Sequence, residues 1–308
     1  MSLKLHDTNL AVMEQLGVFR FLTRPQLARL GVADRTSLQR IFARFRNERP
    51  RKVESVSFAV ARREGGFQKV HQLHHLTPAG AECLADITGV DIEEISFPRS
   101  PIFQRDYWHR VAMVDFHIET VLYCRSKGFS LDFFHTCYQT AGANRTPGLL
   151  RGKSAAGGED GRLRRLTKVR TGRYHFFPDI VMAVINPKGT RYFYAVEVHN
   201  GMDTKRILDK LVGKYMPALD EGSISEAFGQ PKSPMILVVF EGEAALRSFL
   251  ERIHGIEHFW KDRRLFAFST IARLKEDYAF AWQFAGGAVG SIFHADGKIV
   301  GPDGKPAF

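Results

Sequence analysis

The sequence has few of the features that mark secreted or membrane proteins. Its three cysteines, Cys83, Cys124 and Cys137, are scattered and form no CxxC pair, which argues against a disulfide framework and against a cysteine zinc site. No apolar run reaches the roughly 18 residues that span a bilayer. The first residues, MSLKLHDTNL, lack the apolar core of a secretory signal. We therefore expect a cytoplasmic protein without a membrane partner.

Acidic residues are scarce relative to basic ones. The 308-residue chain carries 44 Lys and Arg against 33 Asp and Glu, a formal charge of +11. Residues 1–80 hold fourteen basic against six acidic side chains, and residues 142–175 hold nine against two. A generally basic soluble protein is one interpretation, but an excess concentrated in two segments favours surfaces that bind a polyanion, nucleic acid first.

The first fifty residues predict three short helices. Residues 8–20 have apolar positions at near-helical spacing, and residues 21–32 place Thr23 as a helix cap and Pro25 in the first turn. The third helix, within DRTSLQRIFARFRNE, is apolar on one face and arginine-rich elsewhere. Its arginines are Arg35, Arg40, Arg44 and Arg46.

Two alternating strands follow, around a basic tip that contains Arg62 and Arg63, and another helix begins near Thr77. This order predicts a winged-helix DNA-binding domain over residues 1–95, with the third helix as the recognition helix. The four helix arginines, together with Arg62 and Arg63, are the predicted DNA contacts. The alternative is a basic helical domain that binds only protein.

Residues 96–308 alternate helical and strand-like segments in an order that predicts an α/β (α+β) domain, a mixed sheet with helices on its faces. Residues 142–173 interrupt this order with a segment rich in Gly, Ser and Arg, predicted as a basic flexible loop. Arg164 and Arg165 are its candidate DNA contacts. A solvated loop without function is the alternative.

Residues 176–201, FFPDIVMAVINPKGTRYFYAVEVHNG, predict two strands around an NPKG turn. If the turn centres on Lys188, Asp179 and Glu197 are equally far from it and face each other, with Cβ atoms about 4.5–5.5 Å apart. His199 points to the same face because side chains alternate along a strand. The other face is apolar.

Two carboxylates this close repel each other unless a cation lies between them. They suit Mg²⁺ or Mn²⁺, which can activate water and stabilise charge on a phosphoryl oxygen. His199 could bind the metal or act as a base, but it supplies no permanent charge. A lysine of the following helix, Lys205, Lys210 or Lys214, could supply that charge. Two unrelated polar residues at strand ends are the alternative.

These motifs together resemble the replication-relaxation family, which joins a winged helix to a PD-(D/E)XK domain of restriction-endonuclease-like fold. The resemblance spans about residues 8–270. It rests on HHLTPAG after the first hairpin, the helix YWHRVAMVDFHIE, Pro178-Asp179, Glu197-x-His199 and the helix that contains KLVGKY. The family includes proteins of plasmids and conjugative elements and is related to mobilisation relaxases.

The resemblance implies a DNA-binding protein of a mobile genetic element that acts at a transfer or replication origin and nicks DNA with a divalent metal. A non-catalytic regulator or initiator accessory protein with a degenerate nuclease fold is the alternative. The implied partners are duplex DNA, single-stranded DNA after nicking, and accessory mobilisation or replication proteins.

The resemblance also implies roles for single residues. Asp179 and Glu197 become metal ligands, His199 joins them where the family has a lysine or an acidic residue, and Glu119 of the preceding helix completes the site, with Asp115 and His109 as alternatives. Lys210 becomes a catalytic cation. A relaxase also needs a tyrosine nucleophile, for which Tyr215 and Tyr107 are candidates, although either can be a core aromatic.

Overall fold

The computed structural model describes residues 7–61, 67–98, 106–141, 164–201, 203–257, 259, 264–293 and 299–306. The chain divides into two compact units, Met1–Ile118 and Glu119–Phe308, and the division falls inside helix α5 (Tyr107–Lys127). The predicted domain boundary, after residue 95, lies earlier in the chain. Arg62, Arg63 and residues 142–163 of the predicted basic loop lie outside the described residues.

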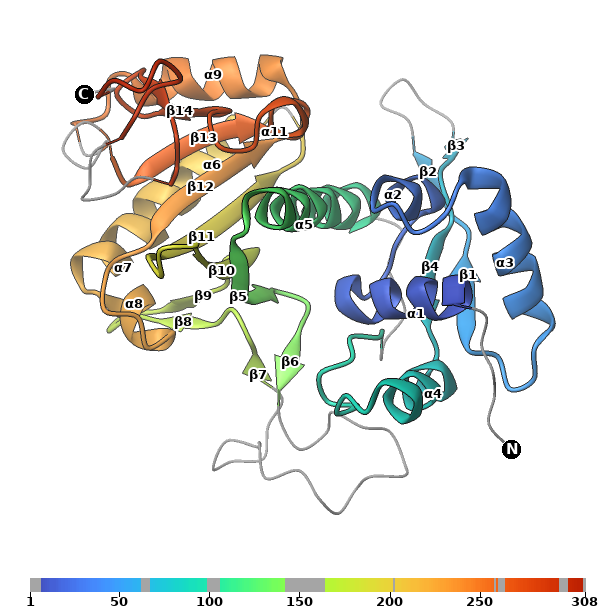
Figure 1. Cartoon of the computed structure of the whole chain (residues 1–308). Coiled ribbons are helices and arrows are strands. Elements are labelled where there is room, and N and C mark those ends of the chain that lie inside the picture. The colour runs from blue at the N-terminus through green and yellow to red at the C-terminus, as the bar shows by residue number, and fades with distance from the viewer. Residues whose placement is uncertain are drawn as a thin grey trace. The chain divides into compact units, whose positions relative to one another are not determined.

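The first unit begins with the three predicted helices (Figure 1), α1 (Asp7–Phe19), α2 (Arg24–Arg29) and α3 (Arg35–Asn47). Thr23 caps α2, because its hydroxyl accepts the backbone N–H of Gln26 while the Gln26 side chain accepts the N–H of Thr23. The Asp34 carboxylate caps α3 by accepting the backbone N–H groups of Thr36 and Ser37. The predicted Thr23 cap and the predicted order of three helices are confirmed.

A β-hairpin with two paired segments along its length follows α3. The strands β1 (Val53–Val56) and β4 (Leu73–Leu76) pair antiparallel, as do β2 (Ala59–Ala61) and β3 (Phe67–Lys69) nearer the tip. Leu22 adds a backbone bridge to His74. Helix α3 packs its buried Phe42 ring on the ring of His74, with centroids 3.6 Å apart. Helix α4 (Pro78–Thr88) then begins at the predicted cap, Thr77.

The second unit is built on a seven-stranded sheet in the order β15-β14-β13-β12-β11-β10-β5. Its strands are β5 (Ser130–Thr136), β10 (Ile180–Ile185), β11 (Arg191–His199), β12 (Met235–Phe240), β13 (Phe266–Thr270), β14 (Trp282–Phe284) and β15 (Val289–Gly290). β11, β12 and β13 run parallel, whereas the other pairs are antiparallel. The predicted mixed α/β architecture is confirmed.

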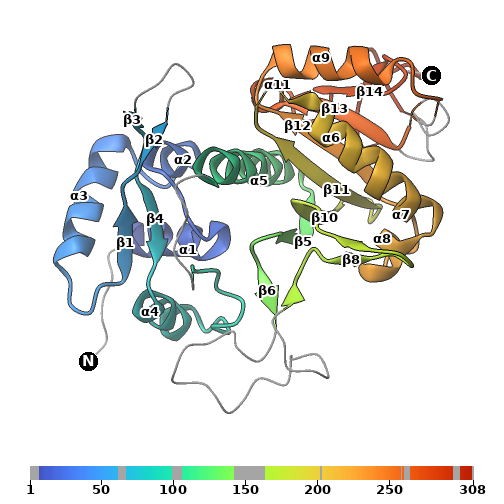
Figure 2. The same ribbon diagram turned by 180° about the vertical axis from the view of Figure 1, so that it is seen from behind.

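Helices cover one face of this sheet (Figure 2). They are α6 (Thr204–Lys210), the π-helix η2 (Leu211–Tyr215), α7 (Met216–Asp220), α8 (Ser223–Ala227) and α9 (Glu243–Ile253). Val181 and Ala195 of the sheet share a buried cluster with Ile207 and Leu211 of these helices. The hairpin β10–β11 is therefore buried on the face that carries Glu197.

The second unit also contains the end of α5, the short helix α11 (Ile271–Glu276) and two pairs of short strands. Thr120 of α5 shares a 2.8 Å hydrogen bond with Tyr278, which follows α11. Two short pairs, β6 (Thr140–Ala141) with β7 (Arg164–Arg165) and β8 (Val169–Arg170) with β9 (His175–Phe176), lie beside the sheet. The end of the predicted basic loop thus contains paired strands. No helix in the described ranges is long and apolar enough to cross a membrane.

Candidate active site

The predicted hairpin register is confirmed. Ile180 pairs with Val196 and Val181 with Ala195, which centres the turn on Lys188. Asp179 stands immediately before β10, where its backbone oxygen accepts the N–H of Cys137 at 2.8 Å. Its carboxylate accepts the backbone N–H of Val198 at 3.0 Å. This second hydrogen bond holds the Asp179 side chain against the backbone of Val198 in the other strand of the hairpin, one residue after Glu197.

Glu197 is a buried carboxylate with two strong donors. Its side chain accepts the Nζ of Lys210 at 2.6 Å and the hydroxyl of Tyr215 at 2.5 Å, and the residue is only 3% exposed. Burial, and then the charge of Asp179, raise the pKa of Glu197 to about 7, although Lys210 and Tyr215 favour the ionised form. Asp179 and Glu197 therefore form an electrostatically coupled acidic pair.

Lys210 supplies a positive charge to this pair. Burial alone would lower the pKa of its amine, but Glu197 and Asp179 outweigh burial and raise it. The same amine donates to the backbone oxygen of Phe177 at 3.1 Å. Of the three lysines that the sequence offered for this role, Lys210 is the one whose amine contacts Glu197, whereas Lys205 is exposed and Lys214 lies over the ring of Tyr174.

The turn of π-helix explains how two residues of one helix reach the same carboxylate. Lys210 and Tyr215 are five residues apart, and an α-helix with 3.6 residues per turn would place them about 140° apart. In η2 the i→i+5 spacing widens the turn, so that both side chains face β11. π-Helical turns in proteins are often found at functional sites.

Tyr215 is fully buried, and burial together with Glu197 raises the pKa of its hydroxyl well above the ordinary value. A phenol of this kind stays protonated and donates to Glu197, which is the opposite of what a nucleophile needs. Tyr107 is also buried, and its hydroxyl donates to the backbone oxygen of His71 at 3.0 Å. Both hydroxyls donate hydrogen bonds inside the fold, and the nucleophile role expected for one of these tyrosines stays a prediction.

His199 and Glu119 have other neighbours among the described residues. The His199 ring packs edge-on against Phe240, with centroids 5.6 Å apart. Glu119 is buried in α5. Burial is the main cause of the raised pKa of the Tyr278 hydroxyl, and the charge of Glu119 makes a smaller contribution in the same direction. Within the described ranges no three His, Cys, Asp or Glu side chains are grouped as a metal site. The predicted metal set of Asp179, Glu197, His199 and Glu119 stays a prediction.

Two basic side chains of the second unit lie over aromatic rings. The exposed Arg165 lies over the ring of Phe177, 4.9 Å from its centroid, and Phe177 is the residue whose backbone oxygen accepts Lys210. Lys214 lies 3.8 Å from the centroid of Tyr174, whose hydroxyl donates to the Lys214 backbone at 3.1 Å. Arg164 contributes backbone to β7.

In the first unit, α3 presents the predicted arginine surface. Leu38, Phe42 and Phe45 are its buried positions. The remaining surface carries the four exposed arginines Arg35, Arg40, Arg44 and Arg46. In the described part of the chain none of these four guanidinium groups pairs with a carboxylate, whereas Arg29 of α2 does pair with Asp115 at 3.1 Å. The surface therefore has unneutralised positive charge.

Comparison with protein-family models, with curated proteins and with solved structures gives no match for this chain. The sequence identified Asp179, Glu197 and Lys210, but it did not show that Tyr215 and Lys210 share one carboxylate. The KLVGKY segment contains both residues, yet their convergence depends on a helical turn that sequence spacing does not encode.

Proposed function

We propose that this protein binds duplex DNA through its first unit and hydrolyses a phosphodiester bond at the Asp179–Glu197–Lys210 centre of the second, with a divalent metal. The observation that carries the proposal is the 2.6 Å contact between Lys210 and Glu197 beside Asp179. A lysine from the neighbouring helix supplies the permanent cation that His199 cannot supply. Two acids of one hairpin and a lysine from the helix packed on it supply the kinds of group that the PD-(D/E)XK resemblance requires.

The donor set fits a hard divalent cation. Asp179 and Glu197 offer carboxylate oxygens, and Mg²⁺ is commonly held by one or two carboxylates plus water and substrate phosphate. Burial and then the charge of Asp179 raise the pKa of Glu197, and a bound cation would offset the repulsion between the two carboxylates. Asp179 and Glu197 would hold the ion, which would polarise the phosphate and lower the pKa of a water.

The chain's own residues have separate roles in this proposal. Lys210 holds a positive charge where negative charge develops on the phosphate. Tyr215 keeps one Glu197 oxygen in place, and the backbone N–H of Val198 keeps Asp179 in place. The cleavage is hydrolytic, with no covalent bond to Tyr215, because that hydroxyl is buried and its pKa is raised.

The first unit is proposed to be a winged helix with α3 as the recognition helix. Three capped or packed helices, a hairpin and a fourth helix occur in the required order, and the exposed side of α3 carries arginines without carboxylate partners among the described residues. The resemblance to the replication-relaxation family adds the setting: a transfer or replication origin of a mobile element, with accessory mobilisation or replication proteins as further partners.

One observation favours a second candidate function. Glu197 is 3% exposed and already engaged by both Lys210 and Tyr215, so its charge is balanced without a metal. A protein that binds DNA but keeps this centre only for its fold, a regulator or initiator accessory protein, would look the same. The two candidates differ in whether DNA is cut.

A nicking assay separates them. Supercoiled plasmid that contains a transfer or replication origin is incubated with the purified chain in Mg²⁺, in Mn²⁺ and in EDTA. The hydrolytic proposal expects open-circular product only with metal, and a loss of about 10²-fold or more for Asp179→Asn and Glu197→Gln. Asp132→Asn, on strand β5 of the same sheet, is the control and keeps wild-type nicking. Tight binding without any nicking in either metal establishes the regulator instead.

A further inference from the structure

A short hairpin ties Arg165 to the part of the chain that borders the carboxylate centre. Arg165 of β7 pairs with Thr140 of β6. Just before β6, the backbone N–H of Cys137 donates to the backbone oxygen of Asp179 at 2.8 Å, and the Sγ of Cys137 lies 4.0 Å from the Asp179 carboxylate. The strand that carries Arg165 is thus anchored beside one of the two acids.

One residue, Phe177, holds two cations. The Arg165 guanidinium lies over its ring, 4.9 Å from the centroid, and its backbone oxygen accepts the amine of Lys210 at 3.1 Å. Phe177 also stands two residues before Asp179 in the chain. Stacking on a ring fixes the face of a guanidinium and leaves the N–H groups at its edge for other acceptors.

The charge of Arg165 is felt at the acidic pair. Burial is the main cause of the raised pKa of the Cys137 thiol, and the charges of Asp179 and Glu197 raise it further. The charges of Lys210 and Arg165 act on the same thiol in the opposite direction. Arg165 therefore belongs to the same electrostatic neighbourhood as the two acids and the lysine.

The amine of Lys210 has at most one N–H group left for a substrate. An ammonium group has three donors, and Glu197 and the backbone oxygen of Phe177 accept two of them, at 2.6 and 3.1 Å. Arg165 is exposed and has no carboxylate partner among the described residues. Its guanidinium can therefore bind a phosphate through two parallel N–H bonds, which Lys210 cannot do.

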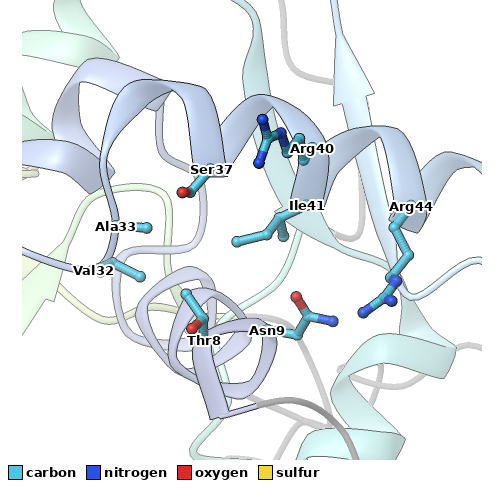
Figure 3. A pocket seen from close by; sticks show the side chains of 8 residues that line it. All are labelled: Thr8, Asn9, Val32, Ala33, Ser37, Arg40, Ile41 and Arg44. Atoms are coloured by element: carbon cyan, nitrogen blue, oxygen red, sulfur yellow. The ribbon is translucent and has the colours of Figure 1, made fainter.

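Three other arginines lack this combination of a ring and available donors. Arg191 lies over the ring of Phe133, 5.9 Å from its centroid, but its guanidinium pairs with the Asp132 carboxylate. Figure 3 shows Arg40 and Arg44 of α3 at a hollow beside α1, with their guanidinium groups turned away from each other. Neither lies over an aromatic ring in the described part of the chain. Such groups suit contacts along a DNA backbone, whereas a fixed guanidinium suits one phosphate.

We propose that Arg165 binds a DNA phosphate at the Asp179–Glu197–Lys210 centre, and that this phosphate is the one that is cut. Two N–H groups of the guanidinium donate to its oxygens, while Phe177 holds Arg165 by its ring and Lys210 by its backbone oxygen. The negative charge that develops during hydrolysis then faces two cations of the chain. The inference rests on the proposed function, because it adds a catalytic residue to the same reaction.

Single-turnover nicking of supercoiled origin plasmid by excess enzyme in Mn²⁺ tests this role. Arg165→Met should lower the rate by about 10²-fold. Arg165→Lys should restore only a small part of it, because an ammonium group lacks the planar fork of donors. Arg170→Met removes an exposed arginine of β8 and is the matched control, which should cut at the wild-type rate. An unchanged rate for Arg165→Met, or an equal loss for Arg170→Met, would overturn the proposal.

Phe177→Leu tests how Arg165 is held. Leucine removes the ring and keeps the backbone oxygen that accepts Lys210. The rate should therefore fall when Phe177→Leu is made in the wild type and hardly change when it is added to Arg165→Met, because the two residues act as a unit. Losses that simply add would show that the ring does not act through Arg165.

Binding of a labelled duplex in EDTA separates this inference from the proposed cleavage. If the wild type binds DNA but never cuts it, the cleavage proposal fails, and the salt dependence of binding decides whether Arg165 contacts a phosphate. One such contact contributes about −0.9 to the slope of log affinity against log salt. Arg165→Met should make the slope shallower by about that amount, whereas Arg170→Met should leave it unchanged. The wild-type slope in Arg165→Met would overturn phosphate binding by this residue.

Discussion

The buried carboxylate of Glu197 has one acidic neighbour, Asp179, and two hydrogen-bond donors, Lys210 and Tyr215. These neighbours and the burial together determine its pKa. Burial and Asp179 favour the neutral form, whereas Lys210 and Tyr215 favour the charged form. The first pair of effects is larger, so the pKa rises to about 7. A carboxyl poised near neutrality changes its charge readily when a cation arrives or leaves.

This pKa predicts a dependence of stability on pH in metal-free buffer. The folded protein keeps the Glu197 proton up to about pH 7, whereas the unfolded chain loses it near 4.5. The free energy of unfolding should therefore fall as pH rises from 4.5 to 7, by an amount on the order of 3 kcal/mol from this group. Glu197→Gln should remove that part of the slope.

Urea unfolding of both proteins at several pH values in EDTA measures the difference. Identical slopes for Glu197→Gln and the wild type would show that Glu197 titrates normally in the fold. Because glutamine has nearly the shape of the protonated glutamate, the two proteins should be about equally stable near pH 4.5, which serves as the internal control.

Tyr215→Phe tests the second donor. The phenol hydroxyl donates to Glu197 at 2.5 Å inside the core, and a hydrogen bond to a charged group contributes about 1.5–3 kcal/mol. We expect the free energy of unfolding to fall by about that amount at pH 8, where Glu197 is charged, and by less at pH 5. If the hydroxyl acted as a nucleophile instead, a covalent DNA adduct would form with the wild type and vanish in Tyr215→Phe.

Two glycines in helices differ in the space that a Cβ atom would find beside them. A Cβ added to Gly213 of η2 meets nothing within 4 Å, whereas one added to Gly80 of α4 would lie 1.9 Å from the backbone oxygen of Lys52. Gly80 is the glycine of the HHLTPAG segment. That segment therefore has a structural reason for a glycine, a close approach of α4 to the chain before β1.

The same substitution should consequently have opposite effects at the two positions. Gly213→Ala should raise the free energy of unfolding by about 0.5–1 kcal/mol, because alanine loses less backbone freedom in a helix. Gly80→Ala should lower it by about 1–3 kcal/mol or more, because the backbone must move apart. Urea midpoints of both variants measure this, and a stabilised Gly80→Ala would refute the close approach.

Much of this architecture was predictable because its signals are local. The NPKG turn and the alternating strands set the register of β10 and β11, and Thr23, Asp34 and Thr77 mark where helices begin. The contact of Lys210 with Glu197 was foreseen only as one of three options. Choosing among them required the three-dimensional path of α6 and η2, which follows from packing on the sheet rather than from local sequence.

At the scale of the whole molecule, the formal charge of +11 predicts a DNA affinity that falls steeply with salt. Each phosphate contact contributes about −0.9 to the slope of log affinity against log salt on duplex DNA. Replacing both Arg35 and Arg46 with alanine should weaken binding and make the slope shallower by about two such contacts. Replacing Arg247 and Arg252 of α9 removes the same charge elsewhere and should leave the slope nearly unchanged.

Fluorescence anisotropy on a labelled duplex, repeated at several salt concentrations, gives both slopes. Equal effects of the two double variants would mean that only total charge matters and that α3 is not the DNA-binding element. A wild-type affinity that is indifferent to salt would contradict the whole assignment of DNA as the partner.

The most direct test of the central claim compares two lysines of one helix. Lys210 contacts Glu197, whereas Lys205 of the same helix α6 is exposed. The rate of nicking of supercoiled origin plasmid is measured with excess enzyme in Mn²⁺ for the wild type, Lys210→Met and Lys205→Met. Lys210→Met should lower the rate by about 10²-fold or more, whereas Lys205→Met should leave it nearly unchanged. Nicking by Lys210→Met at the wild-type rate would contradict it.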